Sequence, residues 1–549
     1  MRRGRAVADT QLTTGSDTSI AGDGLTRDIG FFGLLLTSEG SIIGSGWLFG
    51  ALACSLIGGP AAIIAWLIGS VAVILLALVH AELGGMFPVS GGTTRFPYYA
   101  FGGLAGASFG WFSWLQAVGT APIEVEAAIT YTGNYWHGLT TVSGGVPVLT
   151  GLGYLVATVM MALFVVANLF GVRYLVRANS AITTWKVIVP VLTILVLFFT
   201  RFDTSNFTSH GFAPFGLHGI LNAVSDGGAV FALVGFEQAV QLGGESRNPQ
   251  RDMPRAVIFS MLIGATIYIL LQVVFIGALP QHALAHGWAN LTFTGIFGPF
   301  AGLAKGLGLA WLAYILYADA IIAPTGSGLI YTTTTSRITF GMSKNGHVPS
   351  IFEKTTTKAN VPVFGLIFTF LMGLLLFLPF PGWQKLVGFI TSATVLMYAG
   401  APLALGALRL QKPDAERPYR LPWAAVLCPA SFISASLIIY WSGWEVVWKL
   451  MVAVVLGYVL MGISRITHAN PVHSPLDWSA AIWLWPYLGG LTLISYLGQF
   501  QGGRMHIPFY WDMVVVAAWS LVVYYTAIRL RLPESKVDEY AQGVYGFES

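Results

Sequence analysis

About fourteen apolar stretches of roughly 20 residues follow one another along this chain, and each is long enough to cross a bilayer as a helix. In lipid, backbone polar groups must be paired within the protein, which helices achieve on their own. We therefore predict an all-α integral membrane protein, with twelve crossings as the alternative if the last two stretches lie at the interface. The stretches are 30–56, 60–84, 103–133, 149–170, 179–200, 219–243, 254–279, 303–337, 361–378, 384–408, 422–442, 445–464, 478–498 and 509–530.

The composition narrows the class of protein further. With 55% hydrophobic and 9% charged residues, the chain is suited to lipid, and its formal net charge of +4 is too small to indicate a nucleic-acid partner. Cys54 and Cys428 both fall in apolar stretches, and no Cys/His cluster has the spacing of a metal site. We expect no disulfide, metal or cofactor. The absence of a nucleophile–base pair in the sequence argues against an enzyme.

The basic residues indicate how the chain is oriented. Of 28 Lys and Arg residues, only Arg201, Lys385 and Arg504 fall on the side opposite the N-terminus, and three lysines lie within or at the edges of stretches. Connections rich in Lys and Arg stay in the cytoplasm. We therefore predict that both termini are cytoplasmic, in the inner (cytoplasmic) membrane of the cell. The first 25 residues lack the apolar core of a cleavable signal peptide.

Two glycine-bearing interruptions, Ile43-Gly44-Ser45-Gly46 and Gly235-Phe236-Glu237, lie inside apolar stretches about 190 residues apart. Broken helices at matching positions of two halves indicate the substrate site of a transporter. The alternative is that these small residues only let helices pack closely.

Each break offers backbone groups to a ligand. The N–H groups of Gly44, Ser45 and Gly46, after Ile43, would lie at the positive end of a half-helix and favour a carboxylate. Carbonyls at the second break would lie at the negative end of a half-helix and favour an ammonium group. The predicted residues of the second break are Phe231, Ala232, Leu233, Val234 and Gly235.

Two charged residues occur at membrane depth. Glu237 is costly there, so it either relays protons or pairs with the unwound backbone. Lys186 lies about 10 Å into the fifth stretch at helical rise. Because burial disfavours the ammonium form, such a lysine can gain and lose a proton during a cycle. The alternative for Lys186 is that its side chain reaches back to the water.

Five motifs follow one another along the chain. They are Gly44-Ser45-Gly46, the run Glu82 to Pro88 followed by Ser90-Gly91-Gly92, Gly235-Phe236-Glu237, Glu245-Ser246-Arg247-Asn248-Pro249 and Arg251-Asp252-Met253-Pro254-Arg255. Together and in this order they resemble the amino acid–polyamine–organocation (APC) permease superfamily over most of residues 28–465. The length and the two extra C-terminal spans resemble its bacterial aspartate:proton symporter branch.

The resemblance implies a LeuT-type fold, in which spans 1–5 and 6–10 form a 5+5 inverted repeat and the first and sixth spans are discontinuous. Spans 11–14 would serve packing or dimer contact, so we expect a monomer or a homodimer. The implied parts are a cytoplasmic tail 1–27, a transport core 28–410 with halves at about 28–200 and 219–410, added spans at 411–531 and a cytoplasmic tail 532–549.

The resemblance also implies roles for single residues. An aromatic residue at the position of Phe231 closes the outer gate in such permeases, and a lysine at the position of Lys186 replaces a bound cation between the first and eighth spans and couples transport to protons. The third and eighth spans flank the substrate. Glu124, Glu126 and Asp319 in those spans are therefore pocket candidates, although residues two apart, as 124 and 126 are, cannot share one helical face.

We predict a secondary active transporter that imports an amino acid by proton symport, with the amino acid, protons and lipid as its partners. The alternatives are an amino-acid exchanger, a carrier of polyamines or inorganic cations, and a non-transporting nutrient sensor. The substrate's side chain stays open. Acidic residues in the third and eighth spans suit a neutral or cationic side chain, whereas the resembling branch carries aspartate.

Overall fold

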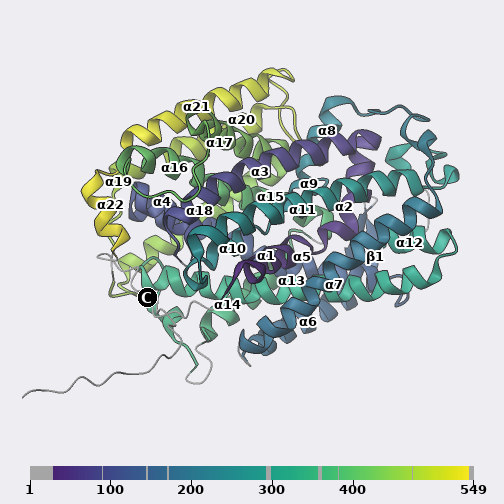
Figure 1. Ribbon diagram of the computed structural model, residues 1–549, viewed down its shortest axis with the longest axis horizontal. Coiled ribbons are helices and arrows are strands. Elements are labelled where there is room, and N and C mark those ends of the chain that lie inside the picture. The colour runs from purple at the N-terminus through teal and green to yellow at the C-terminus, as the bar shows by residue number, and fades with distance from the viewer. Residues whose placement is uncertain are drawn as a thin grey trace, which may run out of the picture.

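A computed structural model of the chain describes residues 29–89, 91–143, 146–169, 172–291, 298–356, 361–380, 382–472 and 474–542, without the side chains of 172–180. The predicted tail 1–27 lies outside the described residues. Helices dominate the fold and run side by side along its longest axis (Figure 1). Figure 1 shows α4, α19 and α22 at one end of this bundle and α8 and α12 at the other.

Helix occurs in every predicted apolar stretch. Among the residues that the structure describes, ten helical segments are long and apolar enough to cross a membrane, and α1 and α14 are shorter apolar helices. The number of crossings stays a prediction. The α-helices are α1 (Phe31–Ile42), α2 (Gly46–Gly58), α3 (Ala62–Met86), α4 (Gly92–Phe101), α5 (Gly103–Thr132), α6 (Gly151–Leu169), α7 (Val172–Thr200), α8 (Gly216–Ser225), α9 (Ala229–Leu233), α10 (Glu237–Gln241), α11 (Pro249–Ala278), α12 (Pro299–Gly306), α13 (Ala310–Lys344), α14 (Val363–Leu376), α15 (Trp383–Tyr398), α16 (Gly400–Gln411), α17 (Ala424–Trp441), α18 (Trp444–Ile466), α19 (Trp478–Ala481), α20 (Leu484–Leu497), α21 (Trp511–Leu530) and α22 (Glu534–Ala541).

The prediction of an all-α fold is wrong in one connection. Strands β1 (Thr140–Ser143) and β2 (Val146–Leu149) pair antiparallel between α5 and α6, with Thr140 opposite Leu149. The hairpin lies between two apolar stretches, and its Thr and Val residues favour extended backbone. A search for 20-residue apolar runs passes over such a short element.

The helices are interrupted at both predicted positions. The first gap separates α1 from α2 between Ile42 and Gly46, and the second separates α9 from α10 between Leu233 and Glu237. Gly235 has a φ of +133°, which a residue with a side chain rarely adopts. A Cβ atom at Gly235 would lie 2.6 Å from the backbone nitrogen of Ile42, so the two breaks press against each other.

A third interruption, which the sequence analysis did not predict, lies between α8 and α9. Gly228 has a φ of +87° there. The segment from α8 to α10 therefore consists of three short helices in place of two half-helices.

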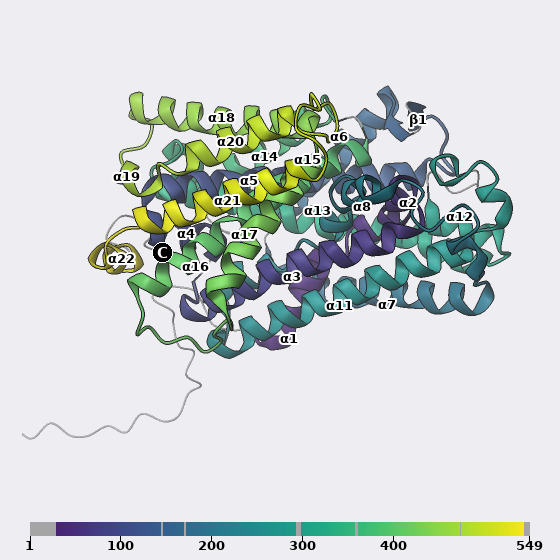
Figure 2. The ribbon, with the colours of Figure 1, turned by 90° about the horizontal axis from the view of Figure 1, so that it is seen from above.

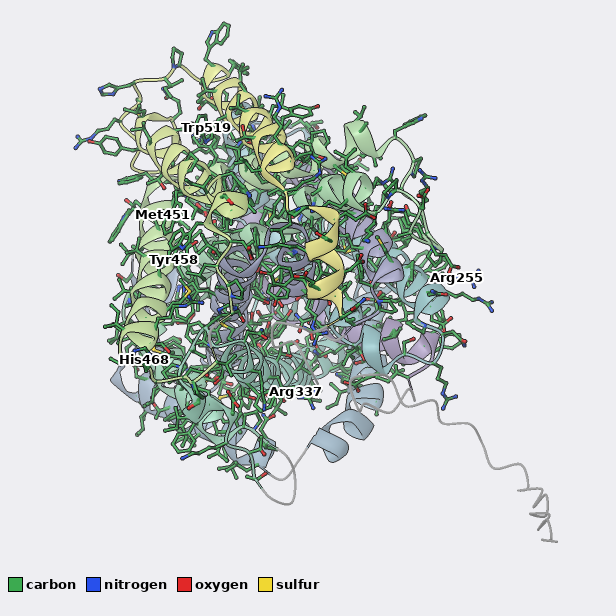
Figure 3. The ribbon with its side chains drawn as sticks, turned by 90° about the vertical axis from the view of Figure 1, so that its left-hand side faces the viewer. Arg255, Arg337, Met451, Tyr458, His468 and Trp519 are labelled. Atoms are coloured by element: carbon green, nitrogen blue, oxygen red, sulfur yellow. The ribbon has the colours of Figure 1, made fainter. Side chains whose placement is uncertain are left out.

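Helices α18, α20 and α21 lie along one edge of the molecule, with α7 and α11 along the opposite edge (Figure 2). Seen from the end that carries α22, Met451 and Tyr458 of α18 and Trp519 of α21 lie on the side away from Arg255 of α11 (Figure 3). The hydroxyl groups of Tyr458 and Ser108 are 2.8 Å apart, which joins α18 to α5.

The α20–α21 loop (498–510) reaches the far end of the bundle and lies against α8. The ring of Phe500 stacks on His218 with centroids 4.6 Å apart. Gln501 Nε2 donates to Asn222 Oδ1 at 3.3 Å and to the carboxylate of Asp226. Because 218, 222 and 226 are spaced by four, the loop contacts one face of this helix and its end.

At the other end of the bundle, α22 packs on α4. The rings of Tyr540 and Tyr98 meet edge to face with centroids 4.4 Å apart. Lys412, after α16, pairs with Asp538 of α22 at 2.7 Å. Part of the predicted tail 532–549 is thus a packed helix.

A buried ion cluster joins α3 to α16. Glu82 has no exposed surface and receives Arg409 through two hydrogen bonds, of 3.0 and 2.6 Å. Arg417 Nε lies 3.2 Å from the same carboxylate, and the backbone N–H of Leu421 donates to it at 2.7 Å. This carboxylate therefore has a structural role.

Candidate functional site

The first break holds a carboxylate that belongs to the protein. The backbone N–H of Ser45, at the start of α2, donates to a carboxylate oxygen of Glu124 on α5 at 2.8 Å. This is the position at the positive end of a half-helix where a ligand carboxylate is expected. A Cβ atom at Gly44 would lie 2.5 Å from the other oxygen of Glu124, so glycine is required for this close approach.

The hydroxyl group of Ser45 also has a protein partner. Trp383, the first residue of α15, donates from Nε1 to Ser45 Oγ at 2.8 Å. Its ring meets Phe231 of α9 edge to face, with centroids 5.8 Å apart, and lies 5.2 Å from the ring of Phe49. We call these three buried rings, which pack together beside Ser45, the aromatic cover of the first break.

Lys186 on α7 lies between α1 and α13. Its ammonium donates to the backbone carbonyl of Gly40 at 2.7 Å and to Ser327 Oγ at 2.8 Å. Gly40 is in the last turn of α1, where a half-helix presents its negative end. Lys186 has no exposed surface, whereas a lysine whose side chain reaches back to the water would keep its ammonium exposed.

Ser327 lies between this lysine and the first break. Its hydroxyl oxygen accepts from Lys186, and it would lie 3.1 Å from a Cβ atom at Gly44. The same test atom is 2.5 Å from Glu124. The ammonium and the carboxylate are therefore separated by little more than the Ser327 side chain and the unwound backbone.

Glu237 occupies the second break. One carboxylate oxygen accepts from the backbone N–H of Gly235 at 2.9 Å and from the hydroxyl of Tyr398, and the other accepts from Tyr331 at 3.0 Å. The side chain is fully buried. Its geometry is that of the structural alternative, a partner for the unwound backbone.

The site is thus built from two helix breaks in contact, the buried Lys186 and the buried carboxylates of Glu124 and Glu237, in a chain whose helices are apolar enough to cross a bilayer. A family model described as "Amino acid permease" matches residues 29–463. The chain belongs to the amino acid permease family. This confirms the resemblance to the APC superfamily, and the chain is a multi-pass membrane permease.

Individual relatives cover the permease almost completely. The glutamate/serine transporter AimA of Bacillus subtilis (strain 168) is 38% identical over 510 residues, which are 92% of this chain and 94% of that protein. The aspartate-proton symporter of the same organism is 35% identical over 513 residues, 93% and 98% of the two chains. The branched-chain amino acid permease BcaP is 25% identical over 481 residues. The predicted branch is confirmed by the second of these.

The pocket candidates on α5 and α13 separate in the permease. Glu124 reaches the first break, whereas both oxygens of the fully buried Glu126 lack a hydrogen-bond partner among the described residues. Asp319 on α13 accepts from Trp47 Nε1 of α2 at 3.1 Å. Glu124 and Glu126 thus differ in their contacts, and a role of either in the pocket stays a prediction.

The residues of the second break lie where the sequence placed them. Phe231, Ala232, Leu233, Val234 and Gly235 are all buried. Ala232 faces Gly46, because a Cβ atom at Gly46 would lie 2.7 Å from that of Ala232.

Sequence reasoning missed Trp383. A tryptophan at the end of an apolar stretch usually belongs to the aromatic belt at the membrane surface, so nothing in the sequence distinguished it. Gly228 did not point to this tryptophan either, because the two residues are far apart in the sequence and meet only in the folded chain. A Cβ atom at Gly228 would lie 3.3 Å from the Trp383 ring.

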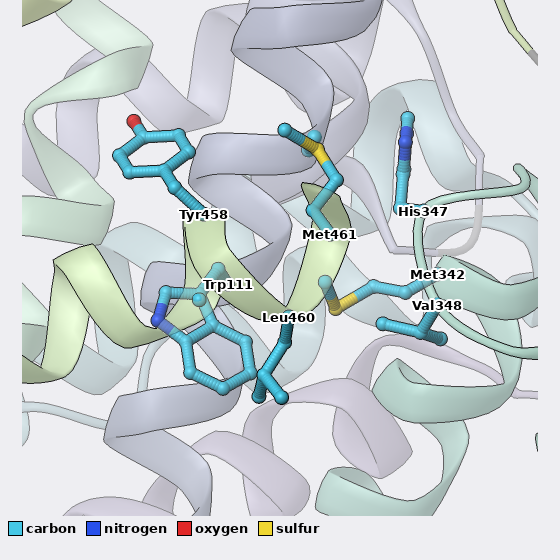
Figure 4. A pocket seen from close by; sticks show the side chains of 9 residues that line it. Trp111, Met342, His347, Val348, Tyr458, Leu460 and Met461 are labelled. Carbon is cyan, nitrogen blue, oxygen red and sulfur yellow. The ribbon is translucent and has the colours of Figure 1, made fainter. Parts of the chain in front are cut away.

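A small cavity lies away from both breaks, between α5, α13 and α18 (Figure 4). At about 20 Å³ it has room for a water molecule but not for an amino acid. The residues labelled around it are Trp111, Met342, His347, Val348, Tyr458, Leu460 and Met461.

Proposed function

We propose that this permease imports an amino acid by proton symport, with the substrate's α-carboxylate bound at the start of α2. The observation that carries this assignment is the 2.8 Å hydrogen bond from the Ser45 N–H to Glu124. The protein's own carboxylate occupies the position expected for the substrate's carboxylate. Family membership and the transporters among its relatives support the same function.

Binding then requires one carboxylate to replace another. The Ser45 N–H can serve only one oxygen well, so an arriving substrate must displace Glu124. An ionised carboxylate without a partner is costly in a buried site, and taking up a proton removes that cost. Substrate entry would therefore favour protonation of Glu124.

Lys186 is the second proposed proton carrier. Its ammonium faces the carbonyl at the end of α1 and stands near Glu124 across Ser327. Loss of its proton would remove the charge that attracts both groups and would loosen α1 from α7 and α13. Glu237 keeps the structural role that its hydrogen bonds indicate.

The second break completes the proposed site. Backbone carbonyls of α9 would receive the substrate's ammonium group, since they lie at the negative end of a short helix next to Gly46. Phe231 is the proposed outer gate. One break lies in the first span and the other in the sixth, and we propose that spans 1–5 and 6–10 form an inverted repeat.

We propose that the end of the bundle carrying α4 and α22 faces the cytoplasm, together with both termini, because nearly all Lys and Arg residues in the connections fall on that side. The relatives carry aspartate, glutamate or serine according to their names. We therefore propose an amino acid with a short polar side chain as the substrate. Exchange of amino acids is the second candidate, because the same site serves both processes.

Uptake into proteoliposomes tests the function. Labelled aspartate, glutamate, serine and arginine are offered with and without an inward proton gradient, with protein-free liposomes as the control. We expect one of the first three to accumulate only with the gradient, and a protonophore to abolish the accumulation. Uptake that ignores the gradient for every amino acid would exclude symport.

A further inference from the structure

We propose that Trp383 is a positioning residue of the outer gate, which holds the Ser45 hydroxyl away from the substrate until the gate opens. This inference rests on the proposed function, because it takes Ser45 as part of the substrate site. It adds a second element to the gate. The sequence pointed only to Phe231 on α9, whereas Trp383 begins α15.

The first step is that both the N–H and the hydroxyl oxygen of Ser45 already have protein partners. Its N–H is bonded to Glu124 and its Oγ accepts from Trp383, both at 2.8 Å, and the residue has no exposed surface. An indole N–H can only donate, so the hydroxyl must act as the acceptor in this bond. The bond fixes the orientation of the hydroxyl group, and the buried indole ring occupies the space beside it, so we infer that a substrate reaches the hydroxyl only after the indole has moved.

The second step is that the Trp383 ring is part of the aromatic cover of the first break. It contacts Phe231 of α9 and Phe49 of α2, and it lies against Gly228, whose positive φ and missing side chain make room for it. The ring therefore touches Ser45, directly before α2, and Gly228, directly before α9. Moving the ring opens the cover and breaks the bond to Ser45 in one step.

The third step is its position along the transport path. Gly382, next to Trp383, packs on Pro147 of β2, at the end of the bundle opposite α22. That end is the proposed outer side. An amino acid arriving from outside therefore meets Phe231 and Trp383 before it reaches Ser45. Opening of the gate breaks the bond between Trp383 and Ser45 at the moment when the substrate needs the Ser45 hydroxyl.

A tryptophan that only fills space makes a different prediction. Buried indole N–H groups usually find some acceptor, so the bond alone does not separate the two roles. The test must therefore ask whether Trp383 acts through the hydroxyl of Ser45. A double-mutant cycle between these residues answers that question.

The readout is the labelling rate of a cysteine behind the gate. Val387 lies one turn after Trp383 on α15, is fully buried and faces Gly228. Val387→Cys is introduced after Cys54 and Cys428 have been replaced by alanine, and a charged, membrane-impermeant thiol reagent is added to reconstituted protein. The rate reports opening of the outer gate and needs no knowledge of the substrate.

Trp383→Phe keeps a ring but removes the N–H, and Ser45→Ala removes the acceptor. We expect each to raise the labelling rate about fivefold, as the loss of one hydrogen bond implies, and the double variant to label no faster than either. Trp111→Phe is the control, because its Nε1 also donates to a backbone carbonyl, the partly buried Ala453 O at 2.9 Å, on α18 and away from the breaks. It should leave the rate unchanged.

Two results would overturn the inference. One is a double variant whose increase in labelling rate equals the product of the two single increases, and the other is an unchanged labelling rate in both single variants. If Trp383→Phe does not fold, Ser45→Ala tests the same bond from the other side. The uptake panel fails or succeeds separately: a cycle that behaves as expected without amino-acid uptake would remove the proposed function and keep the gate. Uptake without the labelling effect would do the reverse.

Discussion

Gly46 and Ala232 are in direct contact across the two helix breaks. A Cβ atom at Gly46 would lie 2.7 Å from the Cβ and 2.8 Å from the Cα of Ala232, a backbone atom that cannot turn aside. The start of α2 and the end of α9 therefore share one surface. Any substrate held by both breaks must fit at the edge of this contact.

Gly46→Val is expected to abolish substrate binding, because the added side chain would separate the two breaks. Binding of a labelled amino acid to purified protein should fall by more than tenfold, and the thermal midpoint should also drop. Gly462→Ala in α18 is the control, since no atom lies within 4 Å of its test Cβ and alanine suits a helix. Unchanged affinity in Gly46→Val would exclude the proposed carboxylate site.

Lys186→Ala should eliminate gradient-driven accumulation while sparing some exchange of amino acid across the membrane. The substitution removes the ammonium that bonds Gly40 and Ser327 and with it the proposed proton carrier. Accumulation and exchange are measured in the same proteoliposomes. Lys305→Ala, at an exposed lysine of α12, should behave as the unmodified protein does. Full accumulation in Lys186→Ala would leave the lysine a structural role only.

Glu124→Gln should flatten the pH dependence of substrate affinity. In the unmodified permease we expect the apparent KM to rise with pH, because the ionised carboxylate competes better for the Ser45 N–H than the protonated form does. Glutamine cannot ionise, so that part of the rise should disappear. Glu126→Gln is the control, because this residue is two positions away and its oxygens have no hydrogen-bond partner among the described residues. Equal pH profiles for both variants would contradict the competition.

A cross-link between the α20–α21 loop and α8 should stop transport. Cysteines replacing Asn222 and Gln501, whose side chains are hydrogen-bonded at 3.3 Å, are joined by a short bifunctional thiol reagent in a background without other cysteines. If α8 moves when the outer gate opens, uptake should fall to background and return when the link is cleaved. Each single cysteine with the reagent provides the control, and continued uptake in the linked protein would show that α8 stays fixed.

Arg409→Gln should lower stability without touching the site. Glu82 would keep Arg417 and the Leu421 N–H, so the loss should be somewhat below the roughly 3–5 kcal/mol typical of breaking a buried ion pair. Thermal unfolding in detergent measures it. Arg529→Gln, at an exposed position of α21, should have little effect. An equal drop in both would mean that the cluster contributes nothing special.

The sequence alone predicted the parts of this molecule that depend on local chemistry. Gly44 and Gly235 interrupt apolar runs, and a break in a membrane helix needs such residues. Lys186 stood out because a charge at membrane depth has few explanations. Its ammonium lies between Gly40 of α1 and Ser327 of α13, and its role in proton coupling stays a prediction.

The contacts made across the fold could not be predicted in this way. Trp383 and Ser45 are more than 300 positions apart, and each is an ordinary residue for its place in a span. The role of Glu124 depended on which face of α5 meets α2, which spacing restricts but does not decide. Gly228, at the interruption before α9, packs against Trp383, a contact between residues far apart in the sequence.

Ser45 has a final consequence for how tightly the permease holds its cargo. Its N–H and its hydroxyl oxygen both have protein partners before any amino acid arrives, so loading exchanges existing bonds for others of similar strength. Net affinity is then a small difference between two large and nearly equal sums. A carrier arranged in this way binds modestly, lets go easily and is adapted to high throughput rather than to scavenging at trace concentrations.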